Sequence, residues 1–258
     1  MKAMRNAFAV GLLATLVASP LAAITGREVM EKADAVPEPK TSMSQVQMDL
    51  VDKNGTVQSR MMLEYGREPE DLKDIVIIFQ SPASVKDTRF LQKDKAGGGS
   101  DKWIYMPSLR STRRIAASEG DKSFMGSDAT YDDLSGRELD DYEYELLSES
   151  EPKGKWTTYK VECTPKPTTD SQYSKLVTWI DHDTFVPVYT EMYDKDGKLL
   201  KELEVMDLQV VGGYQTPMLN ELRNVQTGHS TKLTIKQIKV DLALPDRIFT
   251  TNFLNTGK

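Results

Sequence analysis

Residues 102–134 read KWIYMPSLRSTRRIAASEGDKSFMGSDATYDDL. An aromatic strand in this stretch runs into a turn at Pro107, then into a basic strand, and then into a polar loop that carries the pair Phe124-Met125. Strand, tight turn and strand in this order indicate antiparallel β-structure. The stretch contains no known catalytic signature, so it points away from an enzyme.

Alternation of apolar and polar residues continues on both sides of this stretch. Val46, Met48 and Leu50 face one way while the residues between them are polar, a period of two that predicts a strand. Asn54-Gly55 then predicts a tight hairpin turn, because this pair tolerates positive φ angles. Further strands are expected at 57–65, 74–80, 88–93, 102–106, 111–116, 142–148, 156–164, 174–181, 186–193, 199–207, 218–225 and 231–240.

This run of hairpins predicts a mainly β fold, a single strongly curved antiparallel sheet of about 11–12 strands that forms an incomplete or half β-barrel. A few short helices should cover it, including one at 26–33 and one within 248–254. Neither a shift in composition nor a Pro/Ser-rich linker divides the meander. We therefore expect residues 24–258 to form one domain.

The N-terminus has the pattern of a secretory signal peptide. Lys2 and Arg5 precede an apolar run from Ala7 to Ala18, and small residues follow up to Ala23. The apolar run is roughly a dozen residues, whereas a membrane span needs about 20. We expect cleavage after Ala23, so that residues 1–23 are removed and the mature chain is exported.

Charge and composition exclude several classes of function. Loss of Lys2 and Arg5 takes the formal net charge from −6 to −8, which disfavours nucleic-acid binding. The lone Cys163 cannot form an internal disulfide, and the two histidines have no metal-ligand partners at suitable spacing. No nucleophile elbow or phosphate-binding glycine loop is present. We expect no catalytic residues, no metal and no cofactor.

The candidate ligand-binding residues are mainly apolar and aromatic side chains of the predicted strands and the polar loop. Many methionines lie in or beside predicted strands, and a methionine-lined concavity adapts to irregular apolar ligands. Phe124 and Met125 stand in a polar loop, which favours a lid or plug over a cavity more than ordinary core packing. The candidates are Met48, Met61, Leu63, Trp103, Tyr105, Phe124 and Met125. Packing of the same residues within the core is the alternative.

Arg110, Arg113 and Arg114 form a basic cluster in a net acidic chain. One interpretation is contact with anionic lipid headgroups or with an acidic surface of a partner protein. The other is a solvated turn whose charge is compensated by nearby Asp and Glu residues.

The motifs of residues 102–134 resemble those of the LolA-like outer-membrane lipoprotein-sorting protein family. The similarity is carried by Trp103-Ile104-Tyr105-Met106-Pro107, by Arg113-Arg114-Ile115, by Phe124-Met125-Gly126-Ser127-Asp128 and by Tyr131-Asp132-Asp133-Leu134. The signal peptide, the early helix, the strand meander and the closing element at 248–250 agree with this family.

The resemblance implies a periplasmic carrier in which an incomplete barrel, covered by helices, holds acyl chains. Its cargo would be a lipid or an acylated lipoprotein moving from the inner toward the outer membrane, with only transient membrane contact. Some relatives work beside exporters of the resistance-nodulation-division (RND) type, and the length of this chain fits that branch. The best-known lipoprotein carriers gate the cavity with one inward-facing arginine, which the residue pattern does not place.

Two other classes of function remain open. The alternative to the carrier is a non-enzymatic adaptor, in which the same curved sheet docks on a transporter and carries no lipid. A secreted hydrolase would need a carboxylate pair in an open cleft, and carboxylates are plentiful, although nothing singles out two of them.

Overall fold

The computed structural model describes residues 23–69, 72–96 and 98–258. Apart from Ala23, the expected signal peptide lies outside the described residues. Within the described ranges, no helix combines the length and the apolar character needed to cross a membrane.

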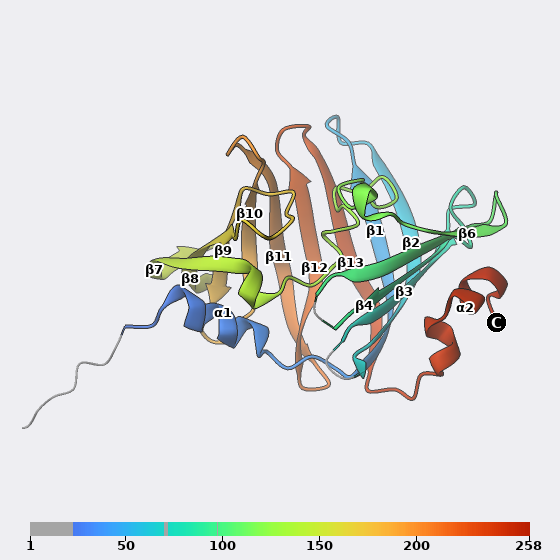
Figure 1. The fold of residues 1–258 in the computed structure, drawn as a ribbon, viewed down its shortest axis with the longest axis horizontal. Helices are drawn as coiled ribbons and strands as arrows, with labels where there is room; N and C mark the ends of the chain where they lie inside the picture. The colour runs from blue at the N-terminus through green and yellow to red at the C-terminus, as the bar shows by residue number, and fades with distance from the viewer. Residues whose placement is uncertain (1–22, 70–71, 97) are drawn as a thin grey trace, which may run out of the picture.

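Thirteen strands form one sheet, and every neighbouring pair is antiparallel (Figure 1). The expected mainly β class is confirmed, and the count exceeds the expected 11–12 strands. The strands are β1 (Thr41–Val51), β2 (Val57–Arg67), β3 (Asp74–Ser81), β4 (Arg89–Asp94), β5 (Ser100–Met106), β6 (Ser111–Arg114), β7 (Tyr142–Lys153), β8 (Trp156–Pro165), β9 (Lys175–Asp181), β10 (Pro187–Tyr193), β11 (Leu199–Val211), β12 (Tyr214–Asn224) and β13 (His229–Val240).

The order of the strands places the first and last of them at the centre of the sheet. From the β1–β13 pair, β2 to β6 extend to one side and β12 back to β7 extend to the other. β6 and β7 are therefore the two edges, although they are consecutive in the chain. The segment between them, residues 115–141, must cross from one edge of the sheet to the other.

The sheet curves but does not close into a barrel, so it has a concave and a convex face (Figure 1). Helix α1 (Gly26–Asp34) packs on β7 and β8, with Val29 buried in the same concave cluster as Val161 and Ile180. The 3-10 turn η4 (Asp246–Phe249) and helix α2 (Thr251–Thr256) cover the convex face of β3, β4 and β5. The two ends of the chain thus cover opposite faces.

Local sequence explains where α1 begins. Thr25 accepts a hydrogen bond from the backbone N–H of Glu28 (3.2 Å), and the Glu28 carboxylate accepts one from the backbone N–H of Thr25 (2.7 Å). This capping box satisfies two backbone donors that the first turn leaves free. Gly26 then lies close to the backbone of β7, where a Cβ atom would stand 2.9 Å from the Leu146 nitrogen. A glycine here lets the helix pack tightly on the edge strand.

The C-terminal segment is expected to contribute strongly to stability. Leu254 is fully buried against β3 and β4, so Leu254→Ala should lower the free energy of unfolding by about 2–4 kcal/mol. Val210→Ala is the control, because Val210 is 64% exposed and its loss should change that free energy by less than about 0.5 kcal/mol. Urea unfolding followed by tryptophan fluorescence measures both. Equal effects of the two substitutions would mean that the C-terminal segment is not an integral part of the fold.

Candidate functional site

Residues 115–141, named here the crossing loop, lie within the concave face of the sheet (Figure 1). Phe124 is only 1% exposed and packs edge-on against Phe90, with ring centroids 5.1 Å apart. Phe79 and Tyr131 complete the aromatic cluster, with centroids 6.1 and 5.8 Å from Phe124. The Phe124 side chain therefore fills apolar space above β3 and β4.

An arginine from the sheet holds the tip of the crossing loop. The Arg60 guanidinium, on β2, donates a hydrogen bond to the backbone oxygen of Met125. Burial lowers the pKa of Arg60. Met125 and Gly126 both have positive φ angles, of 53° and 79°, which turn the backbone so that this carbonyl meets the guanidinium. Glycine adopts such an angle at little cost, whereas Met125 does not.

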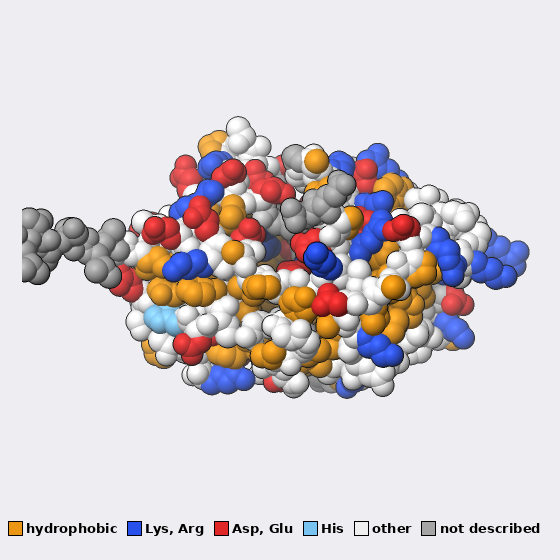
Figure 2. Space-filling model, turned by 90° about the horizontal axis from the view of Figure 1, so that it is seen from below, with side chains coloured by type: hydrophobic (Ala, Val, Ile, Leu, Met, Phe, Trp, Pro, Cys, Tyr) orange, Lys and Arg blue, Asp and Glu red, His pale blue; other side chains and the backbone are white. Residues whose placement is uncertain are grey.

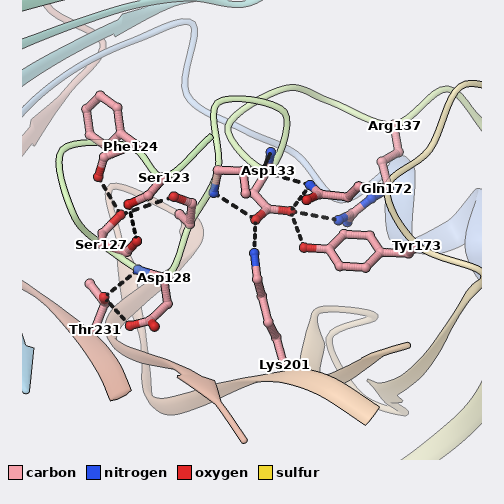
Figure 3. Close-up of polar contacts among 12 residues, drawn as sticks. Ser123, Phe124, Ser127, Asp128, Asp133, Arg137, Gln172, Tyr173, Lys201 and Thr231 are labelled. Carbon is pink, nitrogen blue, oxygen red and sulfur yellow. Dashed lines mark hydrogen bonds and ion pairs between the residues drawn. The ribbon is translucent and has the colours of Figure 1, made fainter. Parts of the chain in front are cut away.

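A second anchor joins the crossing loop to β13. Asp128 accepts a hydrogen bond from the Thr231 hydroxyl (2.6 Å), and its backbone N–H donates to the same hydroxyl oxygen (2.9 Å). The Nδ1 atom of His229 lies 2.7 Å from Oδ2 of Asp128, the same carboxylate oxygen that accepts from Thr231. Ser127, the preceding residue, donates to the backbone oxygen of Phe124 (2.7 Å) and so tightens the turn (Figure 3).

A buried ion pair forms the third anchor. The Asp133 carboxylate accepts from the ammonium group of Lys201, on β11, at 2.8 Å, and the two side chains are only 8% and 5% exposed. It also accepts from the Tyr173 hydroxyl (2.8 Å) and from the backbone N–H of Thr130 (2.9 Å; Figure 3). Desolvation opposes ionisation, but Lys201 and the hydrogen bonds outweigh it and lower the pKa of Asp133.

A mainly apolar cavity of about 100 Å³ remains between the crossing loop and the sheet. By a measure in which one water molecule needs roughly 10–15 Å³, this is room for several waters or a short run of methylenes. Its walls are Val46, Met48, Met62, Glu64, Ile77, Phe124, Ser127, Ala129, Leu134, Leu203, Asn220, Leu222, Thr231 and Leu233. Seen from below, the molecule is hollowed near its centre beside a band of hydrophobic side chains (Figure 2).

Two of the wall residues, Glu64 and Asn220, place a carboxyl and an amide among mainly apolar side chains. Burial raises the pKa of the Glu64 carboxyl, and only a weaker attraction to Lys73 opposes the shift. Across the cavity, the side-chain oxygen of Asn220 is buried and accepts no hydrogen bond from the described residues. Buried polar groups are normally hydrogen-bonded, so the unpartnered oxygen of Asn220 is unusual for a core position.

A larger, polar cavity of about 540 Å³ lies where the edges of the sheet approach each other. Its walls come from the β4–β5 turn, the crossing loop and residues 168–173. Lys102 faces Asp132 there at 3.4 Å, and Arg114 pairs with Asp101. Because these charges pair within the chain, this cavity is less suited to an acyl chain than the apolar one.

Some predicted site residues do face the apolar concavity. Met48 is buried in the concave cluster and lines the cavity, and Phe124 does the same from the crossing loop. Met125 packs against this cluster while partly exposed. The interpretation of the Phe124-Met125 pair as a plug agrees with this position, and binding of a ligand by these residues stays a prediction.

The predicted orientation of four other residues is wrong. Trp103 and Tyr105 pack on the convex face with the C-terminal segment, whereas Ile104 belongs to the concave cluster. Met61 and Leu63 alternate with Met62, which is the cavity residue of β2. Side chains of a strand alternate between faces, so a one-residue difference in assignment reverses inside and outside.

The basic cluster lies at the β6 edge. Arg113 pairs with Glu119 at 2.8 Å and Arg114 with Asp101, while Arg110 stands in the exposed β5–β6 turn with a positive φ of 48°. Arg113 and Arg114 are thus compensated by nearby carboxylates. Their contact with headgroups or a partner remains a prediction.

Sequence reasoning missed Arg60, Glu64, Asn220 and Lys201. Arg60 and Glu64 flank Met62 at alternate positions of β2, and these are inward positions. The sequence did offer a signal for these two residues, because alternation places both charged side chains on the face of β2 that should be buried. Lys201 and Asn220 gave no such signal, because their importance depends on the crossing loop folding over strands far away in the sequence.

The Asp133–Lys201 pair should be needed to hold the crossing loop. Asp133→Ala leaves Lys201 buried without a partner and should lower the free energy of unfolding by about 3–5 kcal/mol. The double variant Asp133→Leu/Lys201→Met should recover most of that loss. Glu31→Ala, which breaks the exposed Arg27–Glu31 pair, is the control and should cost less than about 0.5 kcal/mol. A small effect of Asp133→Ala alone in urea unfolding would contradict the assignment.

Glu64 should make stability depend on pH. The unfolded carboxyl ionises near about 4.3, but burial raises the pKa in the folded protein. The folded state therefore binds more protons above that pH, and stability is lost as pH rises from about 4.3 to the raised pKa. Glu64→Gln should remove this loss, so its stability relative to the native protein should increase between pH 4 and pH 8. A difference that is independent of pH in urea unfolding would refute the burial of an ionisable Glu64.

Comparisons with known proteins agree with this architecture. A DUF1329 family protein from Desulfovibrio piger superposes with a TM-score of 0.84 at 27% identity, over 89% of this chain and 97% of the other. A domain named for outer membrane lipoprotein sorting, from Vibrio parahaemolyticus, gives 0.83 at 29% identity, over 89% and 98%. A LolA superfamily protein from Nitrosomonas europaea shares the fold, with a TM-score of 0.68 at 22% identity over 90% and 100%.

No curated protein sequence matches the chain. A family model with the description "Uncharacterized protein" matches residues 71–256, which is more than half of the chain. With the half-barrel and the neighbours above, this match shows that the chain belongs to that family and is a LolA-like protein.

Proposed function

We propose that this protein is a non-enzymatic periplasmic carrier that shelters acyl chains of a lipid or lipoprotein on the concave face of its sheet. The observation that supports this most is the cover of that face. Over β1 to β5 the cover is the crossing loop, which has little regular structure and is held by three polar anchors. A loop of this kind can leave without unfolding the sheet.

The energetics favour an exchange of the loop for cargo. Displacing Phe124 would expose the apolar side chains of Met48, Phe79 and Phe90, which are now buried. Each methylene that an acyl chain buries there contributes roughly 0.8 kcal/mol. An acyl chain would therefore offset the lost contacts of the loop, and no covalent step is required.

Arg60 is our candidate for the single inward-facing arginine that gates the cavity in the best-known lipoprotein carriers. It is an arginine on the concave face of β2, and it binds the crossing loop at Met125. Releasing this hydrogen bond would free the tip of the loop. The charge of Arg60 would then lie beside the cargo, where burial already disfavours it.

The partners follow from the same proposal. The neighbour named for outer membrane lipoprotein sorting supports cargo that is destined for the outer membrane. The proposed donor is an inner-membrane exporter, such as one of the RND type, and the proposed recipient is an outer-membrane acceptor. Arg110 and the 65% exposed Leu109 beside it form a basic and apolar tip at the β6 end, where basic side chains are also common in Figure 2. Such a tip suits transient contact with anionic headgroups.

Locking the crossing loop should stop lipid uptake. Asp128 and Thr231 touch through their side chains, so Asp128→Cys/Thr231→Cys should form a disulfide that ties the loop to β13. Cys163 stays in place, because burial raises the pKa of its thiol to about 12 and keeps it unreactive. Protein purified from periplasm without detergent is mixed with phosphatidylethanolamine vesicles that contain a palmitoylated peptide. Native mass spectrometry should show at least tenfold less bound lipid or peptide when the disulfide is oxidised than when it is reduced.

The control is a disulfide that leaves the loop free. Asp49→Cys/Ser59→Cys joins neighbouring residues of β1 and β2 on the convex face, and oxidation should not change its uptake. Equal uptake by the oxidised and reduced loop variants would contradict a displaceable plug. No uptake by any reduced protein would reject the carrier and favour the adaptor that docks without lipid.

A further inference from the structure

The polar cavity lies beside the apolar one, and one turn of the crossing loop forms part of the wall of each. Leu134 lines the apolar cavity, whereas its neighbours Asp132, Asp133 and Ser135 line the polar one. The backbone N–H of Ser135 donates to the carbonyl oxygen of Asp132 at 3.1 Å, which closes the turn. If the crossing loop leaves the sheet, this shared wall leaves with it. A ligand that takes its place would have apolar surroundings next to polar ones.

Lys102, on β5, is a buried cation in the wall of the polar cavity. Its side chain is only 9% exposed, and its one polar contact among the described residues is a long hydrogen bond of 3.4 Å to Asp132. An ammonium group carries three N–H donors, so Lys102 has donors to spare. Asp132 belongs to the crossing loop and is itself 55% exposed. Lys102 is therefore a buried charge whose described partner can move away.

A hydroxyl pair stands next to this lysine. Ser100 precedes Lys102 by two residues on β5, so the two side chains lie on the same face of the strand, about 7 Å apart along it. The hydroxyl oxygens of Ser100 and Ser135 are 3.0 Å apart and share one hydrogen bond, so one of the two protons remains for another acceptor. Both serines line the polar cavity. An ammonium group and a hydroxyl donor thus face the same space.

The cationic contacts to the crossing loop all have the same polarity. Lys102 on β5 binds Asp132 of the loop at 3.4 Å. Lys201 on β11 binds Asp133 of the loop at 2.8 Å (Figure 3), and Arg60 on β2 donates to a loop carbonyl oxygen. Release of the loop would remove the acceptors and leave the cations on the concave face. Cations that cargo then covers without a partner are costly, and cargo that brings its own anion avoids this penalty.

We propose that the cargo is an anionic amphiphile whose phosphate or carboxylate group replaces Asp132 at Lys102 while its acyl chain replaces Phe124 in the apolar space. This inference rests on the proposed carrier function and adds the chemical class of the cargo and the place of its headgroup. The Lys102 ammonium binds the anion by charge-assisted hydrogen bonds of about 2.8 Å, and the Ser100 hydroxyl donates to another of its oxygens. Two such bonds on either side of one anionic group match the spacing of these two residues.

Matched dodecyl ligands test this preference. Dodecyl phosphate is anionic, 1-dodecanol is neutral and dodecyltrimethylammonium is cationic, whereas the apolar chain is the same. Displacement of the fluorescent apolar dye N-phenyl-1-naphthylamine from the native protein, below the micelle concentration of each ligand, gives the affinities. We expect dodecyl phosphate to bind about tenfold more tightly than 1-dodecanol, which corresponds to about 1.4 kcal/mol, and the cation to bind most weakly. Dodecanoate distinguishes a carboxylate from a phosphate headgroup, and inorganic phosphate alone should not displace the dye.

Variants assign the preference to Lys102. Lys102→Met should reduce the phosphate-to-alcohol affinity ratio to within about twofold while the alcohol still binds, and Lys102→Arg should keep the preference. The control is Lys175→Met, which removes the same charge from a lysine that pairs with Glu162 and is absent from the described walls of both cavities. Its ratio should match that of the native protein. Asp132→Asn removes the competing carboxylate of the loop and should tighten the binding of dodecyl phosphate.

The outcomes separate the two proposals. If the native protein binds neither the dye nor any dodecyl ligand, the carrier function fails. If it binds dodecyl phosphate and 1-dodecanol equally, the carrier stands and the selection of an anion is wrong. A preference that survives in Lys102→Met would also overturn it, because the anion would then be bound elsewhere. Unchanged or weaker binding of dodecyl phosphate by Asp132→Asn would contradict the replacement of that carboxylate by the headgroup.

Discussion

The two edges of the sheet are consecutive strands in the chain, and this constraint shapes the rest of the molecule. β6 and β7 are the first and last strands in the order of the sheet, so residues 115–141 have to connect its two edges. Crossing over the concave face covers apolar side chains there that would otherwise meet water. The same connection therefore completes the topology and fills part of the concavity. A closed barrel has no edges and needs no such crossing.

The crossing loop is attached in a way that combines stability with the possibility of release. Its apolar contribution is concentrated in Phe124 and Tyr131, which pack on the aromatic side chains of β3 and β4. Its direction is fixed by polar contacts to strands on both sides of the sheet centre, from Arg60 on β2 to Lys201 on β11. Breaking a buried pair by removing one partner is costly, but moving both groups into water restores their hydration. Such contacts favour one closed position without making it permanent.

The concave face also holds polar side chains, and the buried oxygen of one of them, Asn220, has no partner among the described residues. Glu64 and Asn220 occupy inward positions where an apolar residue would stabilise the fold more simply. The convex face contrasts with this, because the polar groups under η4 and α2 are paired: Arg67 with Asp74 and Asp246, and Arg89 with the Leu254 carbonyl oxygen. The convex face is therefore suited to packing within the chain, whereas the concave face is suited to binding a second molecule.

Much of the architecture was decided by local sequence. Alternation of period two and the Asn54-Gly55 turn predicted the antiparallel hairpins, and α1 begins at Gly26 as expected, where Thr25 and Glu28 form its capping box. These features depend on neighbours in the chain, so the sequence contains them directly. The resemblance over residues 102–134 also identified the crossing loop as special, and Phe124, Asp128 and Asp133 are the residues that attach it.

The tertiary structure alone decided which side of each strand faces the cavity and which distant groups meet there. Alternation defines two faces but does not say which is inside, and for this reason Trp103 and Met61 were assigned to the wrong one. Trp103 is instead covered on the convex face by the C-terminal segment, which is more than a hundred residues away in the chain. Glu64 and Asn220 line one cavity only because β1 and β13 pair and bring the two halves of the meander together. Local sequence determines where strands and turns form, whereas the pairing of distant strands determines which face is inside and which residues line the cavity.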